Sequence, residues 1–175
     1  MTIDSQSKRL FYYILLRFYS QLKLKVRESE PEIRMSMLYQ NEELFQLMPQ
    51  RDPTVMVDKI LDADGDVAHT GLTVSEKNYF IEADGRMAEP GLIEHIAQSA
   101  SAFKGHKALQ AGEPLPIGYI GEVKKFHCYV RPAIGQELTT TITLGAEVNG
   151  VTLMTGETRC GDVLVADTQM KIFVE

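Results

Sequence analysis

The sequence predicts an α+β fold in which an antiparallel sheet of about six strands curls around one long central helix. Alternating apolar and polar residues in the last third of the chain indicate strands, and small and apolar residues at helical spacing before them indicate a buried helix. The composition agrees, since 175 residues with 44% hydrophobic and 24% charged residues describe an ordinary globular protein with one main core.

The first elements of the domain are short. Residues 41–48 predict a helix capped by Asn41. Residues 54–62 are rich in valine and isoleucine and predict a strand. A hairpin signal at Asp64-Gly65 then leads into a second strand at about residues 67–75.

The central helix is predicted over Gly91–Leu109, after an aperiodic loop at residues 78–89. Pro90 suits the first position of a helix, where its missing N–H costs no hydrogen bond. Between Ala97 and Ala102 every residue except Gln98 is alanine or serine. Such small side chains let other backbone approach closely, so we expect this helix to be central in the fold.

Four strands are predicted after the helix, at residues 117–130, 138–148, 151–160 and from 163 to the end. Asn149-Gly150 is the strongest short hairpin signal in the chain, and Gly161-Asp162 predicts a further tight turn. One face of such a sheet is buried and the other is solvated. The residues expected to share a face are Leu138, Thr140, Ile142, Leu144, Ala146 and Val148, and then Leu164, Ala166, Thr168, Met170, Ile172 and Val174.

Composition excludes several classes of protein. A net charge of -6 argues against a dedicated nucleic-acid binder. No apolar run approaches the roughly 20 residues of a membrane helix. With no signal peptide expected, and with Cys128 and Cys160 best explained as small strand residues, we expect a reducing cytoplasm. Neither a metal-ligand spacing nor a phosphate loop is found, so no metal and no bound cofactor are expected.

The N-terminal segment differs from the rest, so we expect a basic extension at residues 1–36 and one domain at residues 37–175. Residues 1–27 hold six basic residues and one acid, a net charge of +5, which leaves -11 for the remainder. Apolar residues recur there at helical spacing, so residues 8–27 could contact an anionic membrane. We favour a helix docked on a partner, or an upstream extension from a misassigned start codon.

Three segments resemble the 3-hydroxyacyl-ACP dehydratases, which have the hotdog fold. Leu47–Pro53 and then Val55–Lys59 are similar to the family's "LPHRxPxLLVDR" segment. Pro90–Gln98 is similar to its "PGxLxxEAxAQ" helix, and Ala133–Leu138 to its "VxPGDxL" turn. The resemblance runs from about residue 41 to the C-terminus and is closer to the dehydratase-like proteins of aryl-polyene and related lipid pathways.

The resemblance implies that the chain acts on, or binds, 3-hydroxyacyl thioesters of acyl carrier protein in fatty-acid or polyene lipid synthesis. Dehydration to the trans-2-enoyl thioester needs a base for the α-proton and an acid for the leaving hydroxyl. The family uses a histidine in a "GHFPG" loop, a glutamate on the central helix of the partner subunit and a backbone N–H at the start of that helix.

Four residues are the candidate site. Glu94 matches the family glutamate and is the candidate catalytic residue; otherwise it is a first-turn glutamate that complements the helix dipole. Gly91 could present its N–H to a thioester oxygen, or could serve only close packing. Gln98, one turn after Glu94, is expected to orient that carboxylate or satisfy buried backbone. Gln50 stands at the histidine position of the first motif and can bind substrate but cannot be a base.

The family's catalytic histidine is missing from the loop at Asn78–Glu89. His95 neighbours Glu94 but projects about 100° away around the helix. The other three histidines, for which we expect surface or structural roles, are His69, His106 and His127.

Three interpretations therefore stay open. The first is an active dehydratase whose base is Glu94 alone, or Glu82 or Asp84 of the loop. The second is a non-catalytic subunit that binds acyl-ACP and pairs with an active hotdog partner. The third is a hotdog thioesterase in which Glu94 activates water.

Two kinds of partner are expected. We expect a homodimer or a heterodimer with another hotdog chain through an exposed strand edge, with an acyl tunnel along the interface past Glu94 and Ile117–Val123. Acyl carrier proteins are acidic, as is this chain, so docking would need a local basic patch. The candidates for it, which could also be ordinary solvated charges, are Lys104, Lys107, Lys124, Lys125 and Arg131.

Overall fold

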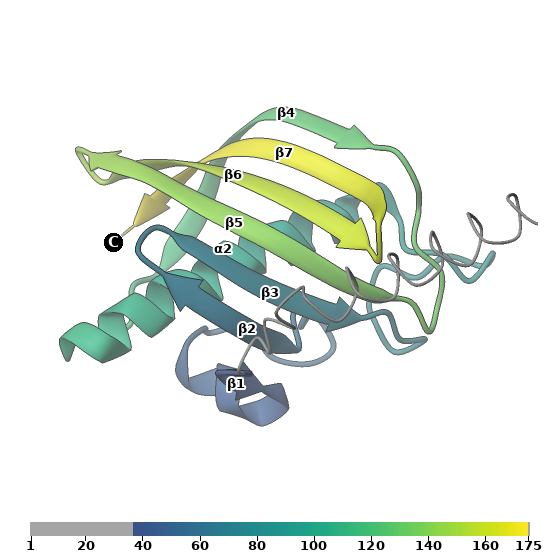
Figure 1. Cartoon of the computed structure of the whole chain (residues 1–175), viewed down its shortest axis with the longest axis horizontal. Helices are drawn as coiled ribbons and strands as arrows, with labels where there is room; N and C mark the ends of the chain where they lie inside the picture. Colours follow the sequence, from purple (N-terminus) through teal and green to yellow (C-terminus); the bar gives the residue numbers. More distant parts are fainter. Residues whose placement is uncertain (1–36, 175) are drawn as a thin grey trace, which may run out of the picture. The chain divides into compact units, whose positions relative to one another are not determined.

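The computed structural model describes residues 37–174, which form one antiparallel seven-stranded sheet and one long helix, α2. The strand order is β1-β2-β3-β5-β6-β7-β4, and the sheet curls around α2 (Figure 1). The predicted hotdog architecture is confirmed. The elements are β1 (Tyr39–Gln40), the 3-10 helix η1 (Asn41–Gln46), β2 (Lys59–Asp64), β3 (Val67–Thr73), α2 (Glu89–Ala111), β4 (Gly118–Cys128), β5 (Glu137–Val148), β6 (Val151–Cys160) and β7 (Val163–Val174).

The strand that raises the count to seven is β1, which has two residues and is too short to show an alternating pattern. The expectations for residues 1–36 fall outside the described residues, so the boundary at residue 37 and the membrane contact of residues 8–27 stay predictions. In the part of the chain that is described, no helix combines the length and the apolarity needed to cross a membrane.

The core lies on both sides of α2, as the run of small residues predicts. Ile96, Ala100 and Phe103 pack against β5, β6 and β7, where Ile142 and Met154 are fully or almost fully buried. Burial of side chains of this size stabilises the fold by about 1.5–3 kcal/mol each. On another side, Ala102 packs with residues of η1 and the segment after it, so α2 has protein on several faces.

The close approach of backbone to α2 is at Gly105. A Cβ atom at this position would collide with the carbonyl group of Leu47. The run of small residues predicts such an approach within Ala97–Ala102, but the structure places it just after that run. Glycine at 105 lets the chain that follows η1 lie directly against the helix.

The hairpin turns follow the glycine signals. Asn149 and Gly150 both have positive φ angles, 52° and 73°, and join β5 to β6 as predicted. The turn predicted at Asp64-Gly65 is one residue later, because Asp64 pairs with Val67 and Gly65 is the first of the two loop residues.

Two early elements differ from the prediction. The cap of η1 is Gln40, which forms a capping box with Glu43, while Asn41 is already in the helix with a φ of 52°. The predicted strand at 54–62 starts only at Lys59. Before it, the backbone polar groups of Thr54 and Met56 bind side chains of α2, and Asp58 donates a single backbone hydrogen bond to Gly71 of β3 at 3.0 Å.

The shared faces of β5 and β7 are confirmed in part. Leu138 through Leu144 alternate as expected, but Ala146 and Val148 are exposed, because the β5–β6 register shifts between Leu144 and Glu147. The β6–β7 register also shifts, next to the pair of Thr158 and Ala166, and the neighbouring residues Val165 and Ala166 are both buried.

One edge of the sheet is β4, which pairs only with β7 (Figure 1). Its pairing is irregular at two places, between Ile120 and Glu122 and between Val123 and Lys125. Apolar side chains of β4 are exposed, and Tyr119 is the most exposed at 54%. An edge with unpaired backbone and exposed apolar residues is suited to pairing with another strand.

Candidate functional site

A pocket of about 260 Å³ lies between α2 and β4. Three of the four predicted site residues, Gln50, Glu94 and Gln98, line it together, although Gln50 is far from the other two in sequence. Its other lining residues are Ala97, Ala100, Ser101, Lys104, Pro116, Gly118, Tyr119, Ile120 and Ile172. The site is therefore built where the central helix meets the exposed edge strand.

Gln98 fixes the carboxylate of Glu94. Its Nε2 donates hydrogen bonds to Glu94 Oε1 at 2.7 Å and to the carbonyl oxygen of Thr54 at 2.8 Å. Its Oε1 accepts from the backbone N–H of Met56 at 2.7 Å. The side chain is 1% exposed, so both expected roles, orienting the carboxylate and satisfying buried backbone, are combined in one rigid amide.

Glu94 is half-buried and faces the pocket. Its hydrogen bond from Gln98 is its only one to residues 37–174, so its other oxygen is available to a bound molecule. A carboxylate held at one oxygen and free at the other can accept or donate a proton at a fixed place.

Gln50 contributes a polar atom without a partner. Its Oε1 is buried and accepts no hydrogen bond from the described residues. A buried amide oxygen of this kind costs about 1–3 kcal/mol, so such atoms are uncommon and call for a functional explanation. The residue as a whole is half-buried and lines the pocket.

Gly91 does not line the pocket. Its N–H donates to the carbonyl oxygen of Ala88 at 2.9 Å, within the first turn of α2. A Cβ at this position would lie 2.6 Å from Phe80 Cβ and 2.7 Å from Met87 Cγ. The arrangement favours close packing over thioester binding as the reason for glycine here.

The four histidines lie away from the pocket. His95 is fully buried, with Nδ1 at 2.5 Å from the carbonyl oxygen of Met56 and Nε2 at 2.7 Å from Thr140 Oγ1. Desolvation by burial lowers its pKa to about 4, so the ring is neutral at pH 7 and its role is structural. The others bind at the surface, His69 to Asp62, His106 to Tyr39 and His127 to Asp167.

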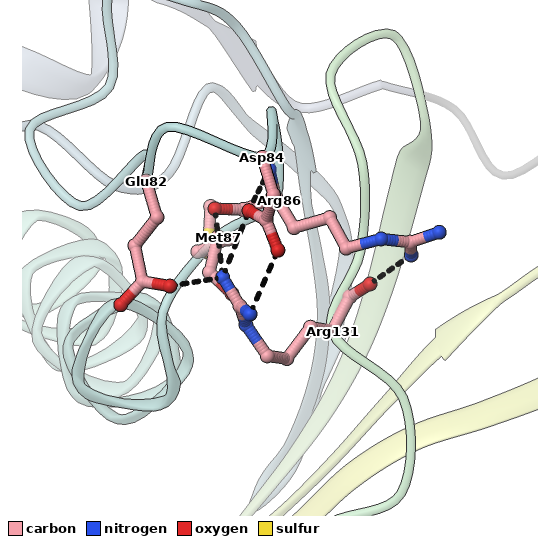
Figure 2. A network of polar contacts seen from close by, with 5 residues as sticks. All are labelled: Glu82, Asp84, Arg86, Met87 and Arg131. Atoms are coloured by element: carbon pink, nitrogen blue, oxygen red, sulfur yellow. Dashed lines mark hydrogen bonds and ion pairs between the residues drawn. The ribbon is translucent and has the colours of Figure 1, made fainter.

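The loop acids Glu82 and Asp84 are held by Arg131 (Figure 2). The guanidinium of Arg131 donates to Glu82 Oε2 at 2.5 Å and to Asp84 Oδ2 at 3.0 Å. Desolvation by burial raises the pKa of Asp84, but hydrogen bonds from Arg86 and Arg131 and their charges lower it overall below its usual value. Neither acid lines the Glu94 pocket, and a carboxylate with a lowered pKa is a weaker base.

The candidate basic patch is only partly free. Arg131 is bound to the loop, Lys107 pairs with Asp66 at 2.7 Å and Lys104 pairs with Glu147 at 3.0 Å. Lys124 and Lys125 are exposed on β4 and make no ion pair with any residue of 37–174. These two are the remaining candidates for carrier-protein docking.

No metal site emerges from residues 37–174, where no three or more His, Cys, Asp or Glu side chains gather to hold an ion. Cys128 and Cys160, expected to be small strand residues, are the last residues of β4 and β6, and both are half-buried free thiols. The polar groups that line the pocket are amide, carboxylate, hydroxyl and ammonium groups.

Sequence reasoning missed that Ala97, Ser101 and Lys104 line the pocket. The signal was present, because positions 94, 97, 98 and 101 follow the i, i+3, i+4, i+7 spacing of one helix face. Small side chains on the helix face that carries Glu94 can indicate either open space beside that carboxylate or the close approach of other backbone. From the sequence, Lys104 is a candidate for a basic docking patch or an ordinary solvated charge, and no pattern assigns it to the pocket.

Curated relatives include 3-hydroxyacyl-[acyl-carrier-protein] dehydratases FabZ. That of Allorhizobium ampelinum is 38% identical over 76 residues, 41% of this chain and 49% of the relative, so the chain spans about half of the length of that protein. That of Yersinia enterocolitica is 28% identical over 138 residues, 74% of this chain and 80% of the relative.

A solved structure agrees on the fold. A chain of the dehydratase heterocomplex ApeI:P from Xenorhabdus doucetiae superposes with a TM-score of 0.70 at 18% identity, over 75% of this chain and 90% of that one. The family model for ApeP-like proteins, described as ApeP dehydratase, matches residues 42–175. The chain therefore belongs to the ApeP-like dehydratase family, within the hotdog fold.

Proposed function

We propose that this protein takes a 3-hydroxyacyl thioester of acyl carrier protein into the pocket between α2 and β4, and that Glu94 is the acid–base residue of its dehydration to the trans-2-enoyl thioester. The observation that carries the proposal is the half-buried Glu94 carboxylate, which faces the pocket with one oxygen fixed by Gln98. The relatives named as FabZ dehydratases of 3-hydroxyacyl-ACP support the choice of substrate.

The reaction removes a proton from C2 and the hydroxyl from C3, so that one molecule of water leaves. Glu94 takes the C2 proton on its free oxygen and passes it to the departing C3 hydroxyl, so that water leaves and the carboxylate is restored. Gln50 lies in the same pocket, and its amide can donate a hydrogen bond to the thioester oxygen, where charge develops as the C2 proton is removed. The hydrogen bond from Gln98 keeps the carboxylate in one orientation throughout.

A second candidate is a non-catalytic subunit that binds acyl-ACP beside an active dehydratase. It is favoured by the positions of the four histidines, none of which lines the pocket. The likeness to a chain of a dehydratase heterocomplex agrees with it. In either case we propose that β4 pairs with a second hotdog chain, either a copy of this chain or a different one, and that this partner completes the pocket. A cytoplasmic location stays our prediction.

The test is to incubate the purified full-length protein with a 3-hydroxyacyl-ACP and to follow the acyl group by mass spectrometry. Loss of one water gives the enoyl product and supports the dehydratase. Binding without conversion supports the non-catalytic subunit, and release of the free acid supports the thioesterase interpretation. Absence of both binding and conversion would contradict the proposed function.

A further inference from the structure

A second pocket continues the first along α2. It has a volume of about 590 Å³ and lies between the C-terminal half of α2 and the β5–β6 hairpin. The two pockets share Lys104 and Pro116. Lys104 is ten residues after Glu94, which corresponds to about 15 Å along a helix. The two pockets thus follow one side of α2, and Lys104 stands where they meet.

The first pocket has both polar and small or apolar lining residues. Gln50, Glu94 and Gln98 supply its amide and carboxylate groups. Between Glu94 and Lys104 the helix side also presents the small side chains of Ala97, Ala100 and Ser101, and on the strand side apolar residues such as Ile120 line the pocket. A thioester with its reacting carbons at Glu94 would place its apolar chain against these residues, pointing toward Lys104.

Lys104 is fixed in place. Its Nζ donates to Glu147 Oε2 at 3.0 Å and to Thr152 Oγ1 at 2.9 Å, and its side chain is only 16% exposed. The hydrogen bond from Lys104 and its charge lower the pKa of Glu147, which keeps that carboxylate ionised at neutral pH. A hydrocarbon chain passing this point would have to displace the ion pair or desolvate an ammonium group, and both are unfavourable.

We propose that Lys104 sets the length of the acyl chain that the site accepts: the chain runs along the Ala97–Ser101 face of α2 and ends at the Lys104–Glu147 pair. This inference rests on the proposed function and adds a specificity-determining residue to it. The second pocket then stays closed to apolar chains as long as Lys104 is charged and paired.

The experiment measures kcat/KM for 3-hydroxyacyl-ACPs of increasing chain length, or Kd where the protein binds without conversion. Lys104→Met keeps the length of the side chain and removes its charge. It should raise the ratio of long-chain to short-chain kcat/KM by roughly tenfold for each two methylene groups beyond the wild-type limit, as burial of those groups would give.

The matched control is Lys59→Met. Lys59 has similar exposure, 15%, and also pairs with a glutamate, Glu137 at 3.5 Å, but it does not line either pocket. The Lys59→Met variant should have the same chain-length profile as the wild type. A second variant, Ser101→Leu, fills the face that precedes Lys104 and should shift the profile to shorter chains by a similar factor.

The outcomes distinguish failure of the proposed role of Lys104 from failure of the proposed function. Wild-type activity or binding with an unchanged length profile in both Lys104→Met and Ser101→Leu overturns the role of Lys104 and leaves the proposed function intact. An equal shift in Lys59→Met also overturns it, because the effect would then be one of charge or stability alone. Absence of both binding and turnover at every length overturns the proposed function together with this inference.

Discussion

His95 and Gln98 bind the two backbone polar groups of the same residue, Met56. The ring of His95 donates to the carbonyl oxygen of Met56 at 2.5 Å, and Gln98 accepts from its N–H at 2.7 Å. Because Gln98 also holds Glu94, the segment around Met56, the central helix and the candidate acid–base residue form one hydrogen-bonded unit.

Replacing Glu94 with glutamine should reduce turnover by about 100- to 10,000-fold, the usual contribution of a general acid or base, because the amide cannot exchange the proton. Enoyl-product formation measures the rate, and thermal melting should show a loss of stability of at most about 1 kcal/mol. Glu89→Gln is the matched control, since Glu89 is an exposed first-turn glutamate of α2 outside the pocket. Robust wild-type activity that survives in Glu94→Gln would contradict our site assignment.

Gln98→Ala should destabilise the fold by about 1–3 kcal/mol, because it leaves the N–H of the buried Met56 without a partner. Urea unfolding followed by circular dichroism measures the change. Gln110→Ala, at an exposed position of the same helix, should cost less than about 0.5 kcal/mol. Equal effects of the two substitutions would show that the Gln98 network adds no stability.

The stability should depend on pH through His95. Its pKa is about 4 in the folded protein and 6.5 when the chain is unfolded, so the unfolded state binds the extra proton between these values. The free energy of unfolding should therefore be highest above pH 6.5 and fall by up to about 3 kcal/mol as the pH drops toward 4.

Urea unfolding of wild type and His95→Gln at several pH values between 7 and 4 measures this dependence. The variant should lose most of the slope. Ile142→Val, a core substitution that costs about 1 kcal/mol, should keep the wild-type slope. The interpretation fails if His95→Gln and wild type have parallel profiles.

The exposed edge of β4 predicts association. Light scattering at micromolar concentration should give a dimer, or a monomer that becomes a heterodimer when its hotdog partner is added. Val123→Lys places a charge on this edge and should weaken the association at least tenfold. Val148→Lys, at an exposed position of the β5–β6 hairpin, is the control. A monomer in every condition, with or without an active dehydratase present, would count against the pairing.

Residues 1–36 should be dispensable for folding. A chain shortened to residues 37–175 keeps β1, in which Tyr39 pairs with Ile60, and all buried residues described above. Scanning calorimetry should give one cooperative transition within a few degrees of that of the full-length protein. Loss of soluble expression on shortening would show that the N-terminal segment packs on the domain.

The sequence predicted the fold well where the signals are local. Asn149-Gly150 specifies its turn by positive φ angles, and the alternation from Leu138 to Leu144 specifies a half-buried strand. The start of β2 could not be predicted in this way. The residues before it have strand composition, but their backbone binds Gln98 and His95, and only the tertiary structure brings those side chains there.

The candidate site shows the same division. Glu94 and Gln98 are one helical turn apart, so spacing alone places them on one face. Gln50 joins them across 44 residues, and only the family resemblance indicated it. The pairing of Lys104 with Glu147 bridges 43 residues between two elements, and no local pattern marks it.

The two irregular pairings in β4 have a consequence for how a neighbour is chosen. Each one interrupts the regular spacing of backbone donors and acceptors along the edge, between Ile120 and Glu122 and between Val123 and Lys125. A long, regular strand from an unrelated protein would meet gaps in the ladder at both places and lose hydrogen bonds there. A strand with matching interruptions would lose none, so discrimination among neighbours is built into the backbone of this edge as well as its side chains.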